Sequence, residues 1–204
     1  MKNQEKNTLQ AYALYTYIDM ETEAKCGVSS NTYTPSHLNP ITNYKAKNRF
    51  ICYAIKRCFN IDIEEKKPMR YINNGLGFIE GFYFSVVECS RVICVCVSRS
   101  PIGLSIQVPF SIYDELEYVN HNFNKNEIEE YQKRKYGDET YFYIFGQKRA
   151  YQKKNNISHE GFKNLDSTQE HYTIHKEKIL EKSFIFFATG NVEFEKIDIE
   201  AILP

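Results

Sequence analysis

Short runs rich in β-branched and aromatic residues alternate along this chain with stretches in which apolar residues recur at helical spacing. Residues 41–59 place apolar side chains at steps of three and four, which predicts a helix with one buried face. A second long helix is expected to begin near Asp138. A shorter helix at residues 128–135 is predicted by Asn124 and Glu127, whose spacing is that of a reciprocal N-terminal cap.

The remaining patterned segments favour strands in both halves of the chain. Residues 92–97 are apolar throughout, as in a strand buried on both faces, whereas residues 192–199 carry charges at alternating positions, as in an edge strand. Glycine, proline and small polar residues at 25–40 predict a loop. The expected strands are residues 12–18, 78–84, 86–87, 91–98, 102–108, 171–176, 183–189 and 192–199.

The order strand, helix, strands recurs in each half of the sequence. This order predicts an α+β protein of two pseudo-symmetric lobes, each a small, mostly antiparallel sheet packed on a long helix. We place the N-terminal lobe at residues 1–100 and the C-terminal lobe at residues 101–204, and expect them to form one pseudo-dimeric unit.

The charge balance narrows the range of partners. The 204 residues include 26 Lys+Arg and 26 Asp+Glu, so no overall positive field attracts nucleic acid or an acidic membrane surface, although a local basic patch stays open. The longest apolar run is far shorter than the roughly 20 residues that span a bilayer. Residues 1–10 are polar and lack an export signal, and the six cysteines form no C-x-x-C pair. We therefore expect a cytoplasmic protein with reduced thiols.

Common catalytic motifs are missing from the sequence. It contains no G-x-G-x-x-G or G-x-x-x-x-G-K-[ST] phosphate loop and no G-x-S-x-G nucleophile elbow. His171 and His175 on a strand predict two surface histidines, and Cys94 with Cys96 share one strand face without a second pair of metal ligands. Candidate chemistry is therefore concentrated in residues 84–108 and 141–153.

Four stretches, in order, resemble the motifs of a known family. Residues 49–62 and the turn Lys67-Pro68 resemble its first helix and Lys-Pro turn, and residues 84–90, followed by V-I-C-V-C-V-S, resemble its F-N-x-S-H-S strand and the strand after it. Residues 101–107 resemble its G-aliphatic-D-aliphatic-E motif, and residues 145–153 resemble its W-x-x-K-E-[AS]-x-x-K helix. The chain is thus similar to the 4'-phosphopantetheinyl transferase superfamily, in its monomeric, two-lobed surfactin-synthetase-activating type.

The resemblance implies a transferase site whose reactive groups are replaced in this chain. In the family, three carboxylates hold Mg²⁺ on the pyrophosphate of coenzyme A, and one of them helps to deprotonate a carrier-protein serine. Their positions hold Ser105, Gln107 and Arg149, which we predict not to bind metal because Mg²⁺ prefers carboxylate and phosphate oxygens. Lys148 and Arg149 occupy catalytic positions of the family, but neither Ser105 nor the permanently protonated Arg149 can act as the base.

The resemblance also implies three positions at or near coenzyme A, which are Lys67, Glu88 and Lys153. Glu88 stands where the family has a histidine facing a cofactor phosphate, so it would place a repulsive carboxylate there. The basic group of Lys148, Arg149 and Lys153 has two interpretations: it neutralises a pyrophosphate without metal, or it forms a solvated helix face.

These replacements predict a catalytically degenerate, monomeric protein that keeps the fold, uses no cofactor, and binds an acyl or peptidyl carrier protein or a biosynthetic complex. The alternative is an active transferase that moves 4'-phosphopantetheine from coenzyme A to a carrier serine, with Mg²⁺ held by carboxylates such as Glu80, Glu88 or Asp114. A third alternative, a small-molecule enzyme that uses the cleft between the lobes for unrelated chemistry, has no motif to support it.

Overall fold

The computed structural model describes residues 11–17, 44–65, 67–73, 75–134, 137–179 and 181–202. Within these ranges the chain is an α+β protein with two β-sheets. The loop predicted at residues 25–40 lies outside the described residues.

The larger sheet has the strand order β2-β3-β4-β5-β1-β9. Neighbouring strands are antiparallel, except that β9 runs parallel to β1. As the alternating charges predicted, β9 is an edge strand, and it joins a sheet whose other strands come from the first half of the sequence. The strands are β1 (Ala11–Tyr17), β2 (Arg70–Asn73), β3 (Leu76–Ile79), β4 (Phe82–Cys89), β5 (Val92–Ser98) and β9 (Val192–Lys196).

The smaller sheet is antiparallel and has the order β6-β8-β7. Its strands are β6 (Leu104–Gln107), β7 (Tyr172–Ile179) and β8 (Lys182–Thr189). The helices are α2 (Tyr44–Phe59), α3 (Glu115–Asn122), α4 (Lys125–Lys133), α5 (Asp138–Lys154) and the short 3-10 helix η2 (Ile199–Ala201).

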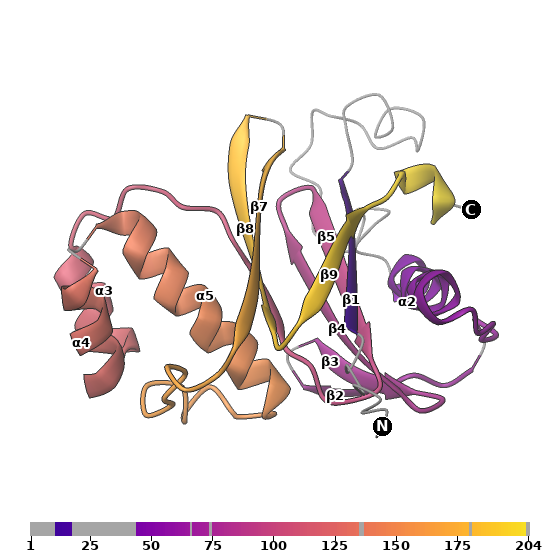
Figure 1. Ribbon diagram of the computed structural model, residues 1–204, viewed down its shortest axis with the longest axis horizontal. Coiled ribbons are helices and arrows are strands. Elements are labelled where there is room, and N and C mark those ends of the chain that lie inside the picture. Colours follow the sequence, from indigo (N-terminus) through magenta and orange to yellow (C-terminus); the bar gives the residue numbers. More distant parts are fainter. Residues whose placement is uncertain are drawn as a thin grey trace, which may run out of the picture.

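The elements stack as layers, which Figure 1 shows from one side to the other as α2, the larger sheet, the smaller sheet and α5. Helices α3 and α4 lie on the outer side of α5 (Figure 1). Each sheet therefore has one face against a long helix and one face against the other sheet.

Side-chain alternation along the strands explains how both faces of each sheet are filled. On β5, Ile93, Val95 and Val97 belong to the core against α2, whereas Cys94 and Cys96 face the smaller sheet. All seven residues of β5 are buried, which confirms the predicted buried strand. Strand β8 alternates in the same way, with Phe184, Phe186 and Ala188 towards the larger sheet and Ile185 and Phe187 towards α5.

The predicted helices are confirmed, and the cap of α4 forms as its sequence indicates. The Asn124 side chain accepts a hydrogen bond from the Glu127 backbone N–H at 2.9 Å, and Glu127 Oε2 accepts one from the Asn124 N–H at 3.1 Å. Helix α3 was not predicted, because it is eight residues long and buries a single side chain, Val119. So short an apolar stripe gives no clear periodic signal.

Two sequence-based predictions are wrong. Residues 78–84 do not form one strand, since Glu80 and Gly81 adopt φ values of 46° and 82° and close a tight hairpin between β3 and β4. Positive φ at both loop residues matches the right-handed twist of the flanking strands. His175 is half-buried, unlike the exposed His171, because its ring lies 5.2 Å from that of Phe194 in a stacked arrangement at the junction of the two sheets.

The helices in the described ranges are all too short or too polar to cross a membrane.

Candidate functional site

A cleft of about 540 Å³ opens where β4, β6 and α5 meet. Its walls include Glu88 from β4, Ser105 and Gln107 from β6, and Arg149 and Lys153 from α5. Five of the seven residues that the family resemblance singled out thus lie around one cleft, although they come from segments far apart in the sequence.

Strand β6 presents Ser105 and Gln107 on the same face because side chains alternate along a strand. Leu104 and Ile106 point the other way, into the core between the sheets. Gln107 Nε2 donates a hydrogen bond to Ser105 Oγ at 3.0 Å, so these two polar groups already partner each other.

Helix α5 lies directly beside β6 because Gly103 has no side chain. A Cβ atom at Gly103 would lie 1.8 Å from the carbonyl oxygen of Ala150 and 2.8 Å from the backbone nitrogen of Lys154. Any larger residue would therefore push α5 away, and with it the residues that α5 contributes to the cleft.

Arg149 and Lys153 are four residues apart on α5, so they project from the same helix face one turn apart. Arg149 Nη1 donates a hydrogen bond to Gln152 Oε1 at 3.2 Å, and its guanidinium carbon lies 4.7 Å from the ring centre of Phe162. The Lys153 amine reaches across the cleft to the turn between β2 and β3, since a Cβ atom at Gly75 would lie 3.8 Å from Lys153 Nζ.

Neither of these two cations has a carboxylate partner among the described residues, unlike their neighbours Lys148 and Lys154. Burial lowers the pKa of Lys153 to about 8, the nearby charge of Arg149 lowers it as well, and the Cys94 thiol acts in the opposite direction. Burial likewise lowers the pKa of Arg149. Arg149 and Lys153 are part-buried positive charges without counter-charges, so they repel each other. An anion bound between them would offset this repulsion.

Glu88 lies on the α2 side of the cleft and is already engaged. Lys47 Nζ, from α2, lies 3.0 Å from Glu88 Oε2. Within the described part of the chain the cleft is lined by three cations, Lys47, Arg149 and Lys153, and by the single carboxylate of Glu88, which is a formal charge of +2.

The donor set of this cleft does not fit Mg²⁺. The groups at the family's metal positions are a hydroxyl, an amide and a guanidinium, and the last of these repels a cation. The described residues contain no cluster of three or more His, Cys, Asp and Glu that could hold a metal ion. The same residues do fit a phosphate group, which Arg149 and Lys153 can bind through charge-assisted hydrogen bonds.

No family model matches the sequence, and no curated protein matches it.

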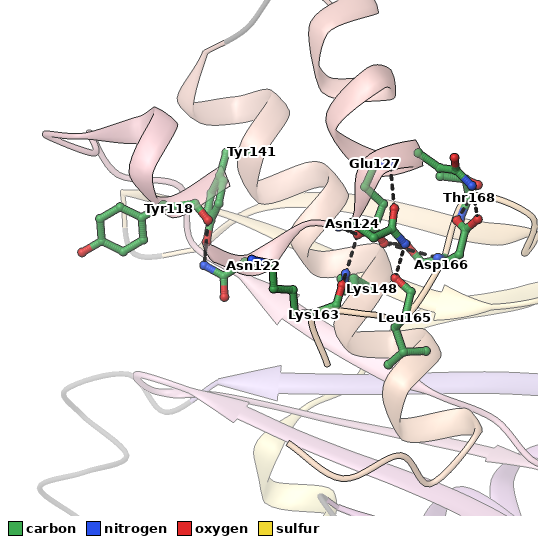
Figure 2. A network of polar contacts seen from close by, with 12 residues as sticks. Tyr118, Asn122, Asn124, Glu127, Tyr141, Lys148, Lys163, Leu165, Asp166 and Thr168 are labelled. Atoms are coloured by element: carbon green, nitrogen blue, oxygen red, sulfur yellow. Dashed lines mark hydrogen bonds and ion pairs between the residues drawn. The ribbon is translucent and has the colours of Figure 1, made fainter. Parts of the chain in front are cut away.

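Lys148 is not in the cleft, and both sequence-based interpretations of its role are wrong. Its side chain is fully buried, with Nζ 2.5 Å from Glu127 Oε2 and 3.1 Å from the carbonyl oxygen of Lys163 (Figure 2). Glu127 is also fully buried and accepts a hydrogen bond from Ser167 Oγ at 2.6 Å. Burial lowers the pKa of Lys148, whereas the Glu127 carboxylate acts to raise it. This pair joins α4, α5 and the loop after α5, so it holds the fold together and is closed to a ligand.

Lys67 also lies away from the cleft. It forms an exposed ion pair at 3.2 Å with Glu80, in the turn between β3 and β4. Asp114 immediately precedes α3 and does not line the cleft. Of the three carboxylates considered as substitute metal ligands, Glu88 alone lines it.

Among the other residues that line the cleft, sequence reasoning did not assign Lys47, Gly75 or Gln152 to the site. Lys47 has no local signal, because its contact with β4 depends on how α2 packs on the larger sheet. The N-N-G sequence at residues 73–75 is a turn signal. That signal locates the bend but does not indicate that Lys153 would reach it.

Proposed function

We propose that this chain is a 4'-phosphopantetheinyl transferase-like protein that does not carry out the transfer and instead binds a phosphate-bearing ligand and a carrier protein. The observation that supports the proposal is the charge of the cleft. Arg149 and Lys153 face it without carboxylate partners among the described residues, while a metal site of the family's type would need acidic groups there. The phosphates of coenzyme A, or of a phosphopantetheine arm already on a carrier protein, have the matching chemistry.

The two cations have complementary roles in holding a phosphate. The planar guanidinium of Arg149 can donate two parallel hydrogen bonds to phosphate oxygens, and the contacts with Phe145 and Phe162 hold its plane in place. Lys153, in its protonated form, adds a compact charge from the same helix face. Binding in this way needs no divalent cation.

The same residues argue against the transfer reaction. Moving the phosphopantetheine group onto a serine requires a base for the serine proton. Ser105 and Gln107 have no basic group, Arg149 stays protonated, and the Glu88 carboxylate is paired with Lys47. Lys153 could accept the proton only in its neutral form, which is the minor form below a pH of about 8. Among the described residues that face the cleft, none combines a free carboxylate with a metal site.

Exposed apolar side chains in the segment after β6 and in α3 support a protein partner. The segment directly after β6 exposes large apolar side chains, which monomeric proteins seldom group together unless they bind something. These are Phe110, Tyr113, Leu116 and Tyr118. We propose an acyl or peptidyl carrier protein as the partner, a single chain as the active unit, and the cytoplasm as its location, where the free thiols of the described cysteines would stay reduced.

Calorimetric titration with pyrophosphate tests the cleft directly. We expect binding that is unchanged by EDTA and weakened at least about tenfold by Arg149→Glu, because that substitution replaces an attractive contact with a repulsive one. Lys154→Gln is the matched control, since Lys154 is the next lysine on α5 but pairs with Glu170 at 2.5 Å and does not line the cleft.

The absence of pyrophosphate binding, or binding that requires Mg²⁺, would overturn the proposed phosphate site.

Incubation of an apo carrier protein with this protein, coenzyme A and Mg²⁺ tests the catalytic alternative by intact mass, with a surfactin-type transferase as positive control. A phosphopantetheine mass gain would show that transfer activity survives with a different set of metal ligands. We expect no gain, together with measurable association of the two proteins.

A further inference from the structure

Lys153 differs from every other lysine that the structure describes at this end of α5. Lys148 is buried against a carboxylate, and Lys154 is paired with Glu170. The Lys153 amine is part-buried, faces a cleft with room for a ligand, and lies beside a guanidinium that would hold an anion.

The amine also lies where a ligand could approach it. Lys153 lines the cleft, and its amine lies close to Gly75 on the opposite wall, where a Cβ atom would be 3.8 Å from Lys153 Nζ and 2.4 Å from the Val86 carbonyl oxygen. Val86 and Val87 contribute apolar surface to the cleft, which favours the uncharged form of the amine. An uncharged amine is a nucleophile, whereas an ammonium ion is not.

We propose that Lys153 is a reactive amine that forms a reversible imine with an aldehyde carrying a phosphate group. The inference rests on the proposed function, because Arg149 would hold the phosphate and so bring the carbonyl carbon to Lys153.

The reaction balances without any oxidant or metal. The lone pair of the neutral amine attacks the carbonyl carbon, the C=O double bond opens, and a carbinolamine forms after proton transfer from nitrogen to oxygen. Loss of that hydroxyl together with the remaining N–H proton, as water, gives the C=N bond, and addition of water reverses the process. The aldehyde is the only co-reactant.

The pH dependence of the reaction should identify the amine. The fraction of Lys153 in the neutral form rises as the pH passes through about 8, whereas an ordinary lysine requires a pH near its usual value of about 10.5. Imine formation at Lys153 should therefore reach half of its maximum near pH 8 and exceed that of exposed lysines at neutral pH.

Pyridoxal 5'-phosphate is a suitable probe because it combines an aldehyde with a phosphate. The full-length protein is incubated with this probe, the imine is fixed with cyanoborohydride, and the modified residue is located by peptide mass mapping. We expect one adduct per chain, on Lys153, formed at least about tenfold more readily than with pyridoxal, which lacks the phosphate.

Three variants separate the amine from the anion site. Lys153→Arg keeps the positive charge but removes the nucleophile, so the adduct should disappear. Arg149→Met should reduce labelling by pyridoxal 5'-phosphate to the level seen with pyridoxal. Lys154→Arg, the matched control, should label as the unmodified protein does.

Labelling spread over surface lysines, or unchanged in Lys153→Arg, would overturn the inference. If pyrophosphate binds and Lys153 is not labelled, the proposed phosphate site stands and the reactive amine is refuted. If Lys153 is labelled equally by both aldehydes and pyrophosphate does not compete, the amine is reactive but the phosphate-directed reaction proposed here is wrong.

Discussion

The contact between Lys148 and Glu127 joins α5 to α4 and to the loop after α5. Figure 2 shows it at the centre of a network that includes the cap of α4 and the loop from Lys163 to Thr168. Both side chains are fully excluded from solvent, so the charge of each depends on the other.

Lys148→Met is therefore expected to destabilise the protein by about 3–5 kcal/mol, because it leaves the Glu127 carboxylate buried without its counter-charge. Urea unfolding followed by circular dichroism measures this change. Lys176→Met is the control, since the pair between Lys176 and Glu139 is exposed to solvent and its loss should cost about 1 kcal/mol or less.

Adding Glu127→Gln to Lys148→Met should recover part of the lost stability, because the amide keeps the shape of the carboxylate without its charge. A double variant less stable than Lys148→Met alone would contradict this account of the pair.

Residues near one another in sequence were easier to predict than residues that meet through folding. Asn124 and Glu127 are three apart, and their cap follows from local geometry. That Glu127 would also bind Lys148, 21 positions away, has no local signal. For the same reason sequence reasoning assigned Lys148 to the cleft, although it could identify Arg149 one position later.

At the scale of elements, α5 is positioned by two close approaches to the smaller sheet. Gly103 admits the backbone of α5 beside β6, and Gly146 admits the ring of Phe187 from β8. Because α5 also carries Arg149 and Lys153, the position of the helix sets the width of the cleft.

Gly146→Ala is expected to destabilise the protein by about 1–3 kcal/mol, although alanine is the better helix former by about 1 kcal/mol. A Cβ atom at position 146 would lie 2.3 Å from Phe187 Cε2, so the ring or the helix must move. Thermal unfolding of the single variant and of Gly146→Ala combined with Phe187→Leu tests this explanation. The smaller leucine should reduce the loss of stability that Gly146→Ala causes. An equal loss with phenylalanine and with leucine at position 187 would point to another cause.

Long periodic segments were predictable at this scale, and short or interrupted ones were not. Helix α2 and strand β5 each have a continuous apolar pattern that matches one period. Helix α3 is too short for its period to show, and the turn at Glu80-Gly81 interrupts a run of β-forming residues without a proline or an asparagine to indicate it.

For the molecule as a whole, the junction of the two sheets contains a titratable group. His175 of β7 lies with Nε2 3.1 Å from Tyr15 Oη of β1, and it stacks on Phe194 of β9. Glu177 Oε2 lies 3.9 Å from the ring, and Lys196 lies 3.8 Å from the other oxygen of that carboxylate.

Stability should fall as the pH drops below about 6.5. Burial lowers the pKa of His175, an effect that Glu177 opposes only in part, so the unfolded chain binds a proton more readily than the folded one. The neutral ring makes its full contribution to the free energy of unfolding at pH values above the pKa of His175 in the unfolded chain. This contribution is lost as the pH falls through the pKa of His175 in the folded protein. Urea unfolding between pH 8 and pH 5 measures the slope.

His175→Gln should flatten this slope specifically, whereas His171→Gln should not, because His171 is exposed at the start of β7. An unaltered slope in His175→Gln would assign the pH dependence to other groups. The prediction of two surface histidines could not anticipate this difference, since it depends on the contact of β7 with strands from the larger sheet.

The pairing of β1 with β9 places the earliest and the latest strands of the described chain side by side, with Ala11 opposite Val192. During synthesis on a ribosome, which proceeds from the N-terminus, β1 must remain without this neighbour until residues 192–196 have been made. An exposed strand edge can pair with other chains in the meantime. The nascent protein therefore depends on β9 to close a site of aggregation, and a message truncated before residue 192 would yield a chain whose larger sheet cannot be completed.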